Sequence, residues 1–179
     1  MIELGNFELH SGNVMVSDPC YEEGSWGQAQ LNNTKIGEWI ANIKQFDEGE
    51  WGIRNGELIA FHKSIEKLNE LDWKLEKTII GVDSGQAGIF DLAVFRNDEV
   101  SMPSNFLSSE IQEEKGEKWY SHICDLTLET KERAGITIGG VVSSSGYGDG
   151  GYKLFTIRDE NDSVVAIKIV FIDNDIEEE

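Results

Sequence analysis

The glycine-rich stretch of residues 143–155, SSSGYGDGGYKLF, constrains the fold of this chain more than any other. Four of its residues are glycines, which turn the backbone through positive φ and let it approach another group closely. Apolar runs flank the stretch on both sides, so it marks a sharp reversal between two strands. Two interpretations stay open: a hairpin turn, or the floor of a binding site, because four glycines exceed what a β-turn needs.

Short alternating runs separated by turn signals predict antiparallel β-sheet along most of the chain. Residues 7–10 and 14–17 read as an opening hairpin. Asp18-Pro19 ends the second run, because proline lacks a ladder donor. Alternation over residues 36–46 favours a strand, with a helix as the competing interpretation. Asn55-Gly56 is a strong two-residue hairpin signal, so a three-strand meander is expected around it.

Two segments have the apolar spacing of a helix. Apolar residues recur every three or four positions in residues 64–77, where Ser64 can cap the first turn, and again in residues 109–130. Further strands are expected at residues 78–83, 88–95, 136–142, 152–158 and 164–172.

These elements add up to one α+β domain over residues 1–172. We expect mainly antiparallel β-sheet, sandwich-like or an open barrel, with about two inserted helices. Hydrophobic residues make up 39% of the chain, which is enough for a packed core. Residues 173–179 are expected to form an acidic C-terminal tail.

Acidic residues outnumber basic ones by 34 to 15, which gives a net charge of −19. This field repels phosphate backbones and anionic lipid, so neither nucleic acid nor a membrane is expected as a direct partner. No stretch approaches the ~18 consecutive apolar residues of a membrane span, and the first residues lack the pattern of a signal peptide. The expected partner is a small molecule or another protein, and the oligomeric state stays open.

Two cysteines are too few for a disulfide framework, which favours free thiols in a reducing cytoplasm, with one bridge as the alternative. A thiol nucleophile needs a base, and no local signature places His10, His62 or His122 beside Cys20. A buried, inert thiol is therefore favoured for Cys20, and for Cys124 as well. The cysteines and histidines also lack the paired spacing of a zinc site.

Four aspartates lie at predicted strand ends or turns: Asp18, Asp83, Asp91 and Asp149. Carboxylates gathered at one rim of a sheet could hold calcium or magnesium, although none of these stretches has the spacing of an EF-hand loop. The favoured interpretation is that each aspartate caps its own turn by accepting hydrogen bonds from nearby backbone N–H groups. No metal and no cofactor is expected.

Ser143, Ser144 and Ser145 precede Gly146. Their hydroxyls and successive backbone N–H groups could cradle a phosphate or a carboxylate, because amides in a turn form an anion-binding concavity. The P-loop, the Rossmann glycine pattern and the Gly-x-Ser-x-Gly elbow are all absent from the sequence.

Three stretches taken together carry a resemblance: Val-Ser-Asp-Pro at residues 16–19, Gly-Val-Asp-Ser-Gly at 81–85 followed by Asp91, and Gly-Tyr-Gly-Asp-Gly-Gly-Tyr at 146–152. Their order and spacing resemble the bacterial domain-of-unknown-function family 4241. That family has a similar Val-Asp-Ala/Ser-Gly element and a late Gly-Asp-Gly-x-Tyr hairpin. The resemblance implies a fold and an intracellular bacterial or phage setting, and it implies no activity.

We expect a non-enzymatic module that binds a ligand or a protein, in the class of small-molecule-sequestering or defence-related proteins. Its site would be formed by converging loops that carry Asp18, Trp26, Asp83, Ser84, Gln86, Ser144, Ser145, Tyr147, Asp149 and Tyr152. One alternative is a hydrolase that uses Asp83, Asp91 and Asp149 around a divalent cation, or the Cys20 thiol. Another is an acidic decoy for a nucleic-acid-binding protein.

Overall fold

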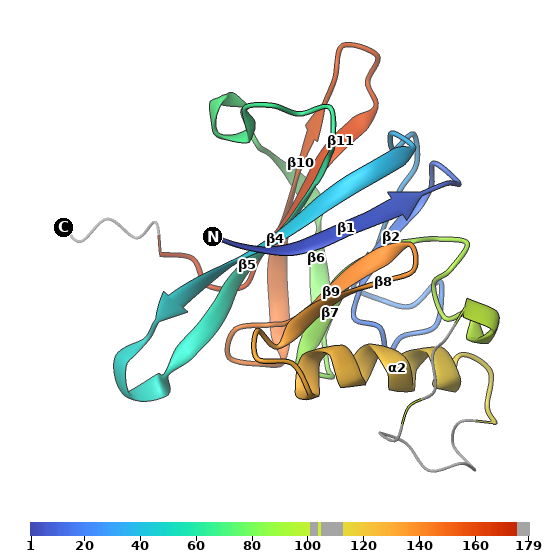
Figure 1. The fold of residues 1–179 in the computed structure, drawn as a ribbon, viewed down its shortest axis with the longest axis vertical. Coiled ribbons are helices and arrows are strands. Elements are labelled where there is room, and N and C mark those ends of the chain that lie inside the picture. The colour runs from blue at the N-terminus through green and yellow to red at the C-terminus, as the bar shows by residue number, and fades with distance from the viewer. Residues whose placement is uncertain (101–103, 105–112, 175–179) are drawn as a thin grey trace.

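The computed structural model describes residues 1–100, 104 and 113–174, in which two antiparallel sheets pack face to face (Figure 1). The six-stranded sheet has the order β1 (Ile2–Leu9), β4 (Gly37–Asp47), β5 (Ile53–His62), β11 (Val164–Val170), β10 (Gly150–Arg158), β6 (Lys74–Val82). The five-stranded sheet has the order β3 (Ala29–Leu31), β2 (Val14–Ser17), β7 (Gln86–Asp91), β9 (Gly140–Ser144), β8 (Ala134–Thr137). The sheets do not close into a barrel within these residues. The predicted fold class, mainly antiparallel and sandwich-like, is confirmed.

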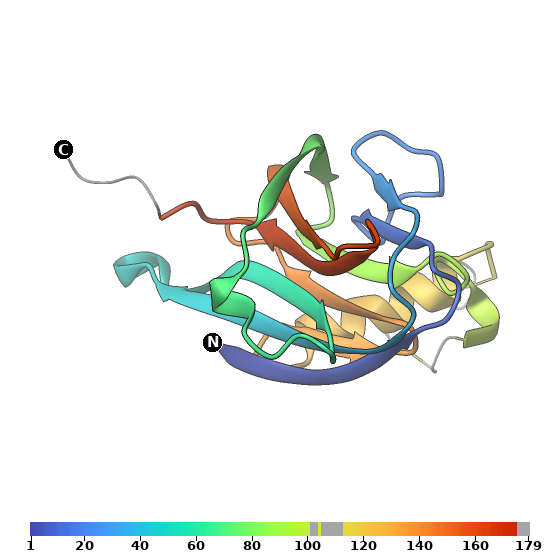
Figure 2. The same ribbon diagram turned by 90° about the horizontal axis from the view of Figure 1, so that it is seen from above.

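Short 3-10 turns and one α-helix complete the described elements. The turns span Gly49–Trp51, Leu68–Glu70 and Asp98–Val100, and the helix is α2 (Glu117–Leu128). The end of the hairpin that β4 and β5 form projects from the body of the fold, as Figures 1 and 2 show.

The main core lies between the sheets, because alternate residues of each strand point inward. Trp39, Ile43 and Leu58 of the six-stranded sheet meet Val16 and Ile89 of the five-stranded one there, and all five are fully buried. Helix α2 covers the other face of the five-stranded sheet (Figure 1). All six residues of β7 are therefore buried, and this explains why the sequence of β7 shows so little polar alternation.

A second core holds α2 against the five-stranded sheet. Trp119 packs edge-on against Phe90, with ring centroids 5.0 Å apart, and against Phe95 at 5.4 Å. Ile123 belongs to the same cluster. The helix predicted over residues 109–130 is thus present in part, because its described portion runs from 117 to 128, while residues 109–112 lie outside the described residues.

The opening hairpin predicted from residues 7–17 is wrong. β1 pairs with β4 in one sheet, and β2 pairs with β3 and β7 in the other. The intervening turn therefore carries the chain from one sheet to the next instead of reversing it within a sheet. The predicted strand end at Asp18-Pro19 is confirmed.

The three-strand meander is also wrong, because Asn55-Gly56 lies inside β5. The register of β4 against β5 shifts between Lys44 and Gln45, and Gly56 is the extra residue of this β-bulge. The Phe46 ring occupies the space beside Gly56, where a Cβ would come within 2.0 Å of it. The strand alternation predicted over residues 36–46 is confirmed as β4.

Residues 64–77 form a 3-10 turn and the start of β6 instead of the predicted helix. Ile65, Leu68 and Trp73 pack onto a buried cluster on the outer face of the six-stranded sheet. Of the four apolar residues with helical spacing, only Ile65 and Leu68 pack there, because Leu71 and Leu75 are exposed. The pairing of β6 with β10 takes the last residues into the sheet. The single strand predicted at residues 136–142 is likewise two strands, β8 and β9, which form a hairpin.

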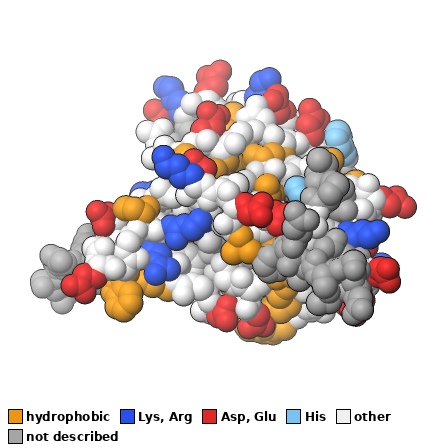
Figure 3. Space-filling model, turned by 60° about the horizontal axis from the view of Figure 1, so that its bottom comes forward, with side chains coloured by type: hydrophobic (Ala, Val, Ile, Leu, Met, Phe, Trp, Pro, Cys, Tyr) orange, Lys and Arg blue, Asp and Glu red, His pale blue; other side chains and the backbone are white. Residues whose placement is uncertain are grey.

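Residue 173 is described, and Lys153 Nζ donates a hydrogen bond to Asp173 Oδ2 at 3.2 Å. The rest of the predicted acidic tail, from residue 175 on, lies outside the described residues. Among the helices of the described residues, none has the length and apolar character needed to cross a membrane. Figure 3 shows one face of the molecule, on which acidic side chains are interspersed with basic and hydrophobic ones.

Substitution of Asn55 by alanine tests the position of this residue inside β5. Its side chain is fully buried. The side-chain nitrogen, Nδ2, lies 2.9–3.3 Å from four oxygen atoms: Glu132 O, Arg133 O, Ser143 Oγ and Ser144 Oγ. We expect Asn55→Ala to lower the free energy of unfolding by about 2–3 kcal/mol, because buried acceptors without donors cost about 1–3 kcal/mol. Urea denaturation measures the loss.

Asn161→Ala is the matched control, since Asn161 is exposed in the turn between β10 and β11. Its cost should stay within about 0.5 kcal/mol. Equal small losses for the two variants would place Asn55 in an exposed turn and contradict the bulge.

Candidate functional site

The two glycine-rich corners of the chain meet at one end of the sandwich. The first corner, residues 83–85, carries the chain from β6 in one sheet to β7 in the other, and the second, residues 145–149, returns it from β9 to β10. Ser145 N donates to Gly85 O at 3.0 Å. The glycine-rich stretch of residues 143–155 therefore contains a crossover between sheets and not a hairpin turn.

Positive φ explains why glycine is needed in these corners. Gly85 has φ 71°, Gly146 has φ 60° and Gly148 has φ 112°, a region that side chains with a Cβ rarely adopt. Gly150, which pairs with Val82, begins β10 directly beside the first corner.

A buried carboxylate, that of Asp18, holds the first corner. Its Oδ1 atom accepts from Cys20 N at 2.8 Å and from Ser84 Oγ at 2.6 Å. Its Oδ2 atom accepts from Asp83 N at 2.8 Å and from Ser84 N at 2.7 Å. The side chain thus ties the end of β2 to the crossover after β6, with each oxygen accepting two hydrogen bonds.

Asp91 has the same role at the opposite end of the β2–β7 pair. It is buried, and its carboxylate accepts from His10 N at 2.7 Å and from the Ser11 hydroxyl at 2.6 Å, which pins the crossover from β1 to β2. β7 separates Asp91 from Gln86 by five residues, or about 17 Å at a strand rise of about 3.3 Å per residue.

The proposed convergence of Asp83, Asp91 and Asp149 on one cation is therefore wrong, because Asp91 lies at the far end of the sandwich. In the described part of the chain there is also no group of three or more Asp, Glu, His or Cys residues arranged to hold a metal ion.

Four of the predicted site residues form contacts inside the protein. Gln86 faces α2, where Nε2 donates to Cys124 Sγ at 3.2 Å. Ser144 Oγ accepts from the buried side-chain amide of Asn55. Ser145 Oγ and Tyr152 Oη both donate to Gly148 O, which closes the glycine-rich turn. These side chains stabilise the corner and present little surface to a ligand.

Tyr147 and Asp149 project from the turn into solvent. Tyr147 is 54% exposed and lies beneath the Arg54 guanidinium, 4.9 Å from the ring centroid. Arg54 Nη1 also donates to Gly146 O at 3.3 Å, so the turn is held against the β4–β5 hairpin.

Residues 20–28 form an ordered loop beside this corner, which we call the binding loop. Asp18 holds its start through Cys20 N, and Gly81 N donates to Gly27 O at 3.0 Å near its end. Gln28 organises its interior: Oε1 accepts from Gly24 N and Ser25 N, each at 2.9 Å. The loop is therefore fixed at both ends and in the middle.

The bulky side chains of the binding loop lie on its outside. Trp26 is 74% exposed, and its ring rests on β6 at Gly81, where a Cβ would come within 2.3 Å of the ring. The Tyr21 hydroxyl donates to Asp83 Oδ2. Tyr21 therefore ties the loop to the first corner, whereas Trp26 lies on the surface.

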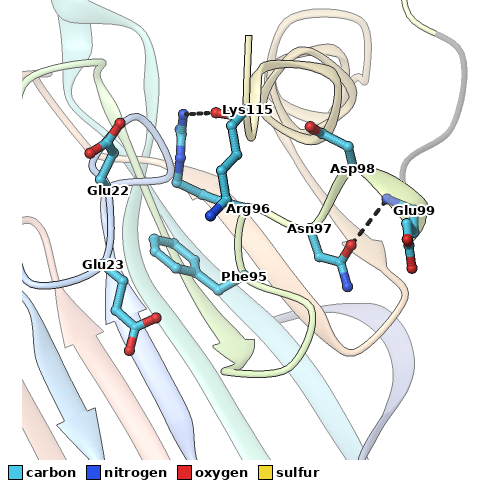
Figure 4. Close-up of a pocket in the computed structure, with 8 residues that line it drawn as sticks. All are labelled: Glu22, Glu23, Phe95, Arg96, Asn97, Asp98, Glu99 and Lys115. Carbon is cyan, nitrogen blue, oxygen red and sulfur yellow. Dashed lines mark hydrogen bonds between the residues drawn. The ribbon is translucent and has the colours of Figure 1, made fainter. Parts of the chain in front are cut away.

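The binding loop forms one wall of a hollow of about 640 Å³ (Figure 4). In the figure Glu22 and Glu23 come from the loop, and Phe95 lies between them and the opposite wall. The residues that line the hollow are Glu22, Glu23, Phe95, Arg96, Asn97, Asp98, Glu99 and Lys115.

The charged side chains of the hollow differ in their contacts. Arg96 donates from Nη1 to Pro19 O at 2.9 Å and from Nη2 to Glu117 Oε1 at 3.0 Å, so it fastens the residue just before the binding loop to α2. Asp98 accepts from Gly116 N and Trp119 N at the start of α2. Glu22 and Glu23 have exposed carboxylates with no hydrogen bond or ion pair within the described ranges.

The Cys20 thiol is poorly suited to nucleophilic chemistry. Burial, a hydrogen bond with Asp18 and the charges of Asp18 and Asp83 all raise its pKa, so it carries its proton at neutral pH. Cys20 and Cys124 are both free thiols. The histidines contact other groups: His122 Nε2 lies 3.0 Å from Thr137 Oγ1, His62 Nδ1 lies 2.8 Å from Ser64 Oγ, and His10 Nε2 lies 4.0 Å from Glu8.

Sequence reasoning missed Gln28, Glu22, Glu23 and Arg96. The Gly-Ser-Trp-Gly run at residues 24–27 is a local signal of a loop, and the glutamine two residues after its tryptophan could have been considered as an internal cap. Arg96 gave no local signal, because its partners lie 77 and 21 positions away in sequence.

The pH dependence of stability tests the role of Asp91. Burial alone would raise its pKa, but hydrogen bonds from the Ser11 hydroxyl and from the amides of Ala93, His10 and Ser11 lower it on balance. A lowered folded-state pKa gives stability above the unfolded value of about 4, which is lost as pH falls through the folded pKa. The difference in free energy of unfolding between wild type and Asp91→Asn should therefore be larger at pH 7 than at about pH 3.

Urea denaturation of both proteins at the two pH values measures this difference. Asp72→Asn serves as the control, since Asp72 is exposed, and it should change little at either pH. A difference for Asp91→Asn that stays constant between the two pH values would contradict the role assigned to the carboxylate.

Comparison with known proteins supports the resemblance found in the sequence. A family model described as "Protein of unknown function (DUF4241)" matches residues 7–169 of the 179-residue chain. The match includes both glycine-rich corners, Asp18 and the binding loop. No curated protein and no solved structure matches the chain. The chain therefore belongs to the DUF4241 family of proteins of unknown function.

Proposed function

We propose that this protein is a non-enzymatic binding module that recognises another protein through its binding loop. The observation that carries the proposal is the 74% exposure of Trp26 on a loop that the fold holds rigidly. A large aromatic side chain is costly to expose, and tryptophan is enriched among the residues that dominate binding energy at interfaces.

Preorganisation supports the proposal. Gln28 Nε2 donates to Ser17 Oγ and to Glu22 O, each at 3.0 Å, in addition to the two bonds that its oxygen accepts. The loop therefore loses little conformational entropy on binding, which favours affinity. An ordered loop on a rigid sheet scaffold is a common place for recognition residues.

The partner expected here has a basic group next to an apolar pocket. Trp26 would enter the pocket, and the Glu22 and Glu23 carboxylates of the same loop would face the basic group across the hollow. The net charge of −19 would speed association with such a partner and make it sensitive to salt.

The alternatives have less support from the described residues. A hydrolase at Cys20 would need a thiolate, and the raised pKa of this thiol opposes one. A decoy for a nucleic-acid-binding protein would need contiguous acidic rows, and the face drawn in Figure 3 has acidic residues mixed with other types.

Affinity enrichment with the full chain as bait tests the proposal. Wild type, Trp26→Ala and a double Glu22→Gln/Glu23→Gln variant are incubated with lysate of the source organism, and bound proteins are quantified by mass spectrometry. We expect at least one protein to be depleted about tenfold or more by Trp26→Ala, because truncating such an anchor costs about 2 kcal/mol or more. The double variant should deplete the same protein, and the wild-type enrichment should fall with added salt.

Trp51→Ala is the matched control, since Trp51 is 68% exposed at the end of the β4–β5 hairpin, away from the binding loop. It should leave the enriched protein unchanged. Identical enrichment for wild type and Trp26→Ala, or loss with Trp51→Ala alone, would contradict the proposal. Thermal melting of each variant shows that the fold is intact.

A further inference from the structure

The outer face of the six-stranded sheet carries a row of charged residues across four neighbouring strands. Lys44 of β4 is paired with Glu57 of β5, Glu57 with Val170 of β11, and Val170 with Lys153 of β10. Lys168, two residues before Val170, points to the same side of β11. We call the three lysines of this surface the lysine face.

These side chains line a hollow of about 360 Å³ on the sheet. The hollow has an aromatic floor next to the lysines, supplied by Phe46 and Phe155. Lys168 is held between two rings: its ammonium lies 4.7 Å from the centroid of Trp73 and 5.1 Å from that of Phe155. Lys44 lies 5.2 Å from the centroid of Phe46.

Aromatic rings position an ammonium group without neutralising its charge. Within the described residues neither Lys44 nor Lys168 has a carboxylate within 4 Å. Lys153 does have one, because its ammonium lies 3.2 Å from Asp173 Oδ2. Glu57 is the other acid that lines the hollow. The ammonium groups of Lys44 and Lys168 are thus positioned by rings and have no carboxylate within 4 Å in the described residues, in a chain whose net charge is −19.

We infer that the lysine face is a second site, separate from the binding loop, that takes a phosphate group of a small molecule. Lys153 of β10 and Lys168 of β11 lie on the same face of adjacent strands, so a compact anion of two or more negative charges can contact both ammonium groups, and charge-assisted hydrogen bonds of this kind are strong. The surrounding negative charge disfavours a polymer, while screening beyond about 8 Å at physiological ionic strength leaves local contacts to a small anion largely intact.

Titration of the full chain with sodium pyrophosphate at constant ionic strength tests this inference. Amide chemical shifts in 1H–15N spectra should move in a saturable way at residues 153–155 and 168–170 and stay unchanged in the binding loop. Adenosine diphosphate, titrated in parallel, shows whether a planar base adds affinity through the aromatic floor. Lys168→Met keeps the stem between the rings, removes the charge, and should raise the Kd for pyrophosphate about tenfold or more.

Asp173→Asn is a second test, which should change the Kd for pyrophosphate in the opposite direction to Lys168→Met. It removes the carboxylate that competes for Lys153, so it should lower the Kd for pyrophosphate. Lys118→Gln is the control, since Lys118 is exposed on α2, and it should leave the Kd unchanged. The inference is overturned if pyrophosphate produces no saturable shifts up to about 10 mM, or if Lys168→Met and Lys118→Gln change the Kd equally.

Discussion

The buried Asp18 carboxylate is the interaction on which the candidate site depends. Hydrogen bonds to a charged group contribute about 1.5–3 kcal/mol each, and this side chain accepts four of them. They join the end of β2, the start of the binding loop and the crossover after β6. Asp91 repeats the arrangement at the other end of β7 for the crossover after β1. The two sheets are thus fastened at both ends of the β2–β7 pair by carboxylates that bind backbone. The turn-cap interpretation described only part of this, because Cys20 N and Ala93 N are local donors, whereas the other backbone donors lie 65–81 positions away in sequence.

This fastening has a consequence for the surface. Because Asp18 and Gly27 fix the ends of residues 20–28, the loop needs no buried side chain of its own to stay ordered. Trp26 can therefore lie on the surface, against the backbone of Gly81, while Arg96 joins Pro19, just before the loop, to α2. The proposed recognition rests on this exposed ring on an ordered loop.

The sequence was a good guide wherever a strong local pattern agreed with the tertiary contacts. Alternation predicted β4, and the glycine-aspartate corners were expected to meet at one end, as the Ser145–Gly85 contact confirms. It was a poor guide wherever tertiary contacts outweighed local signals: the Asn55 side chain is buried against distant backbone, so a turn dipeptide lies inside a strand. The sequence also did not show that β1 and β2 belong to different sheets, since the short turn after β1 is compatible with a hairpin as well as with a crossover. Without the sheet assignment, the sequence also could not show that Asp91 lies at the opposite end of β7 from Asp83.

Hydrogen exchange at the Asp83 and Ser84 amides tests most directly whether Asp18 fastens this corner. Both amides are in a turn, yet each donates to Asp18 Oδ2, so their exchange should be as slow as that of the central strands. In Asp18→Ala the same amides, together with those of residues 20–28, should exchange rapidly while the amides of β4 and β5 stay protected. Rapid exchange of the Asp83 and Ser84 amides in the wild type, or unchanged protection in the variant, would show that the corner and its loop are held by something other than this carboxylate.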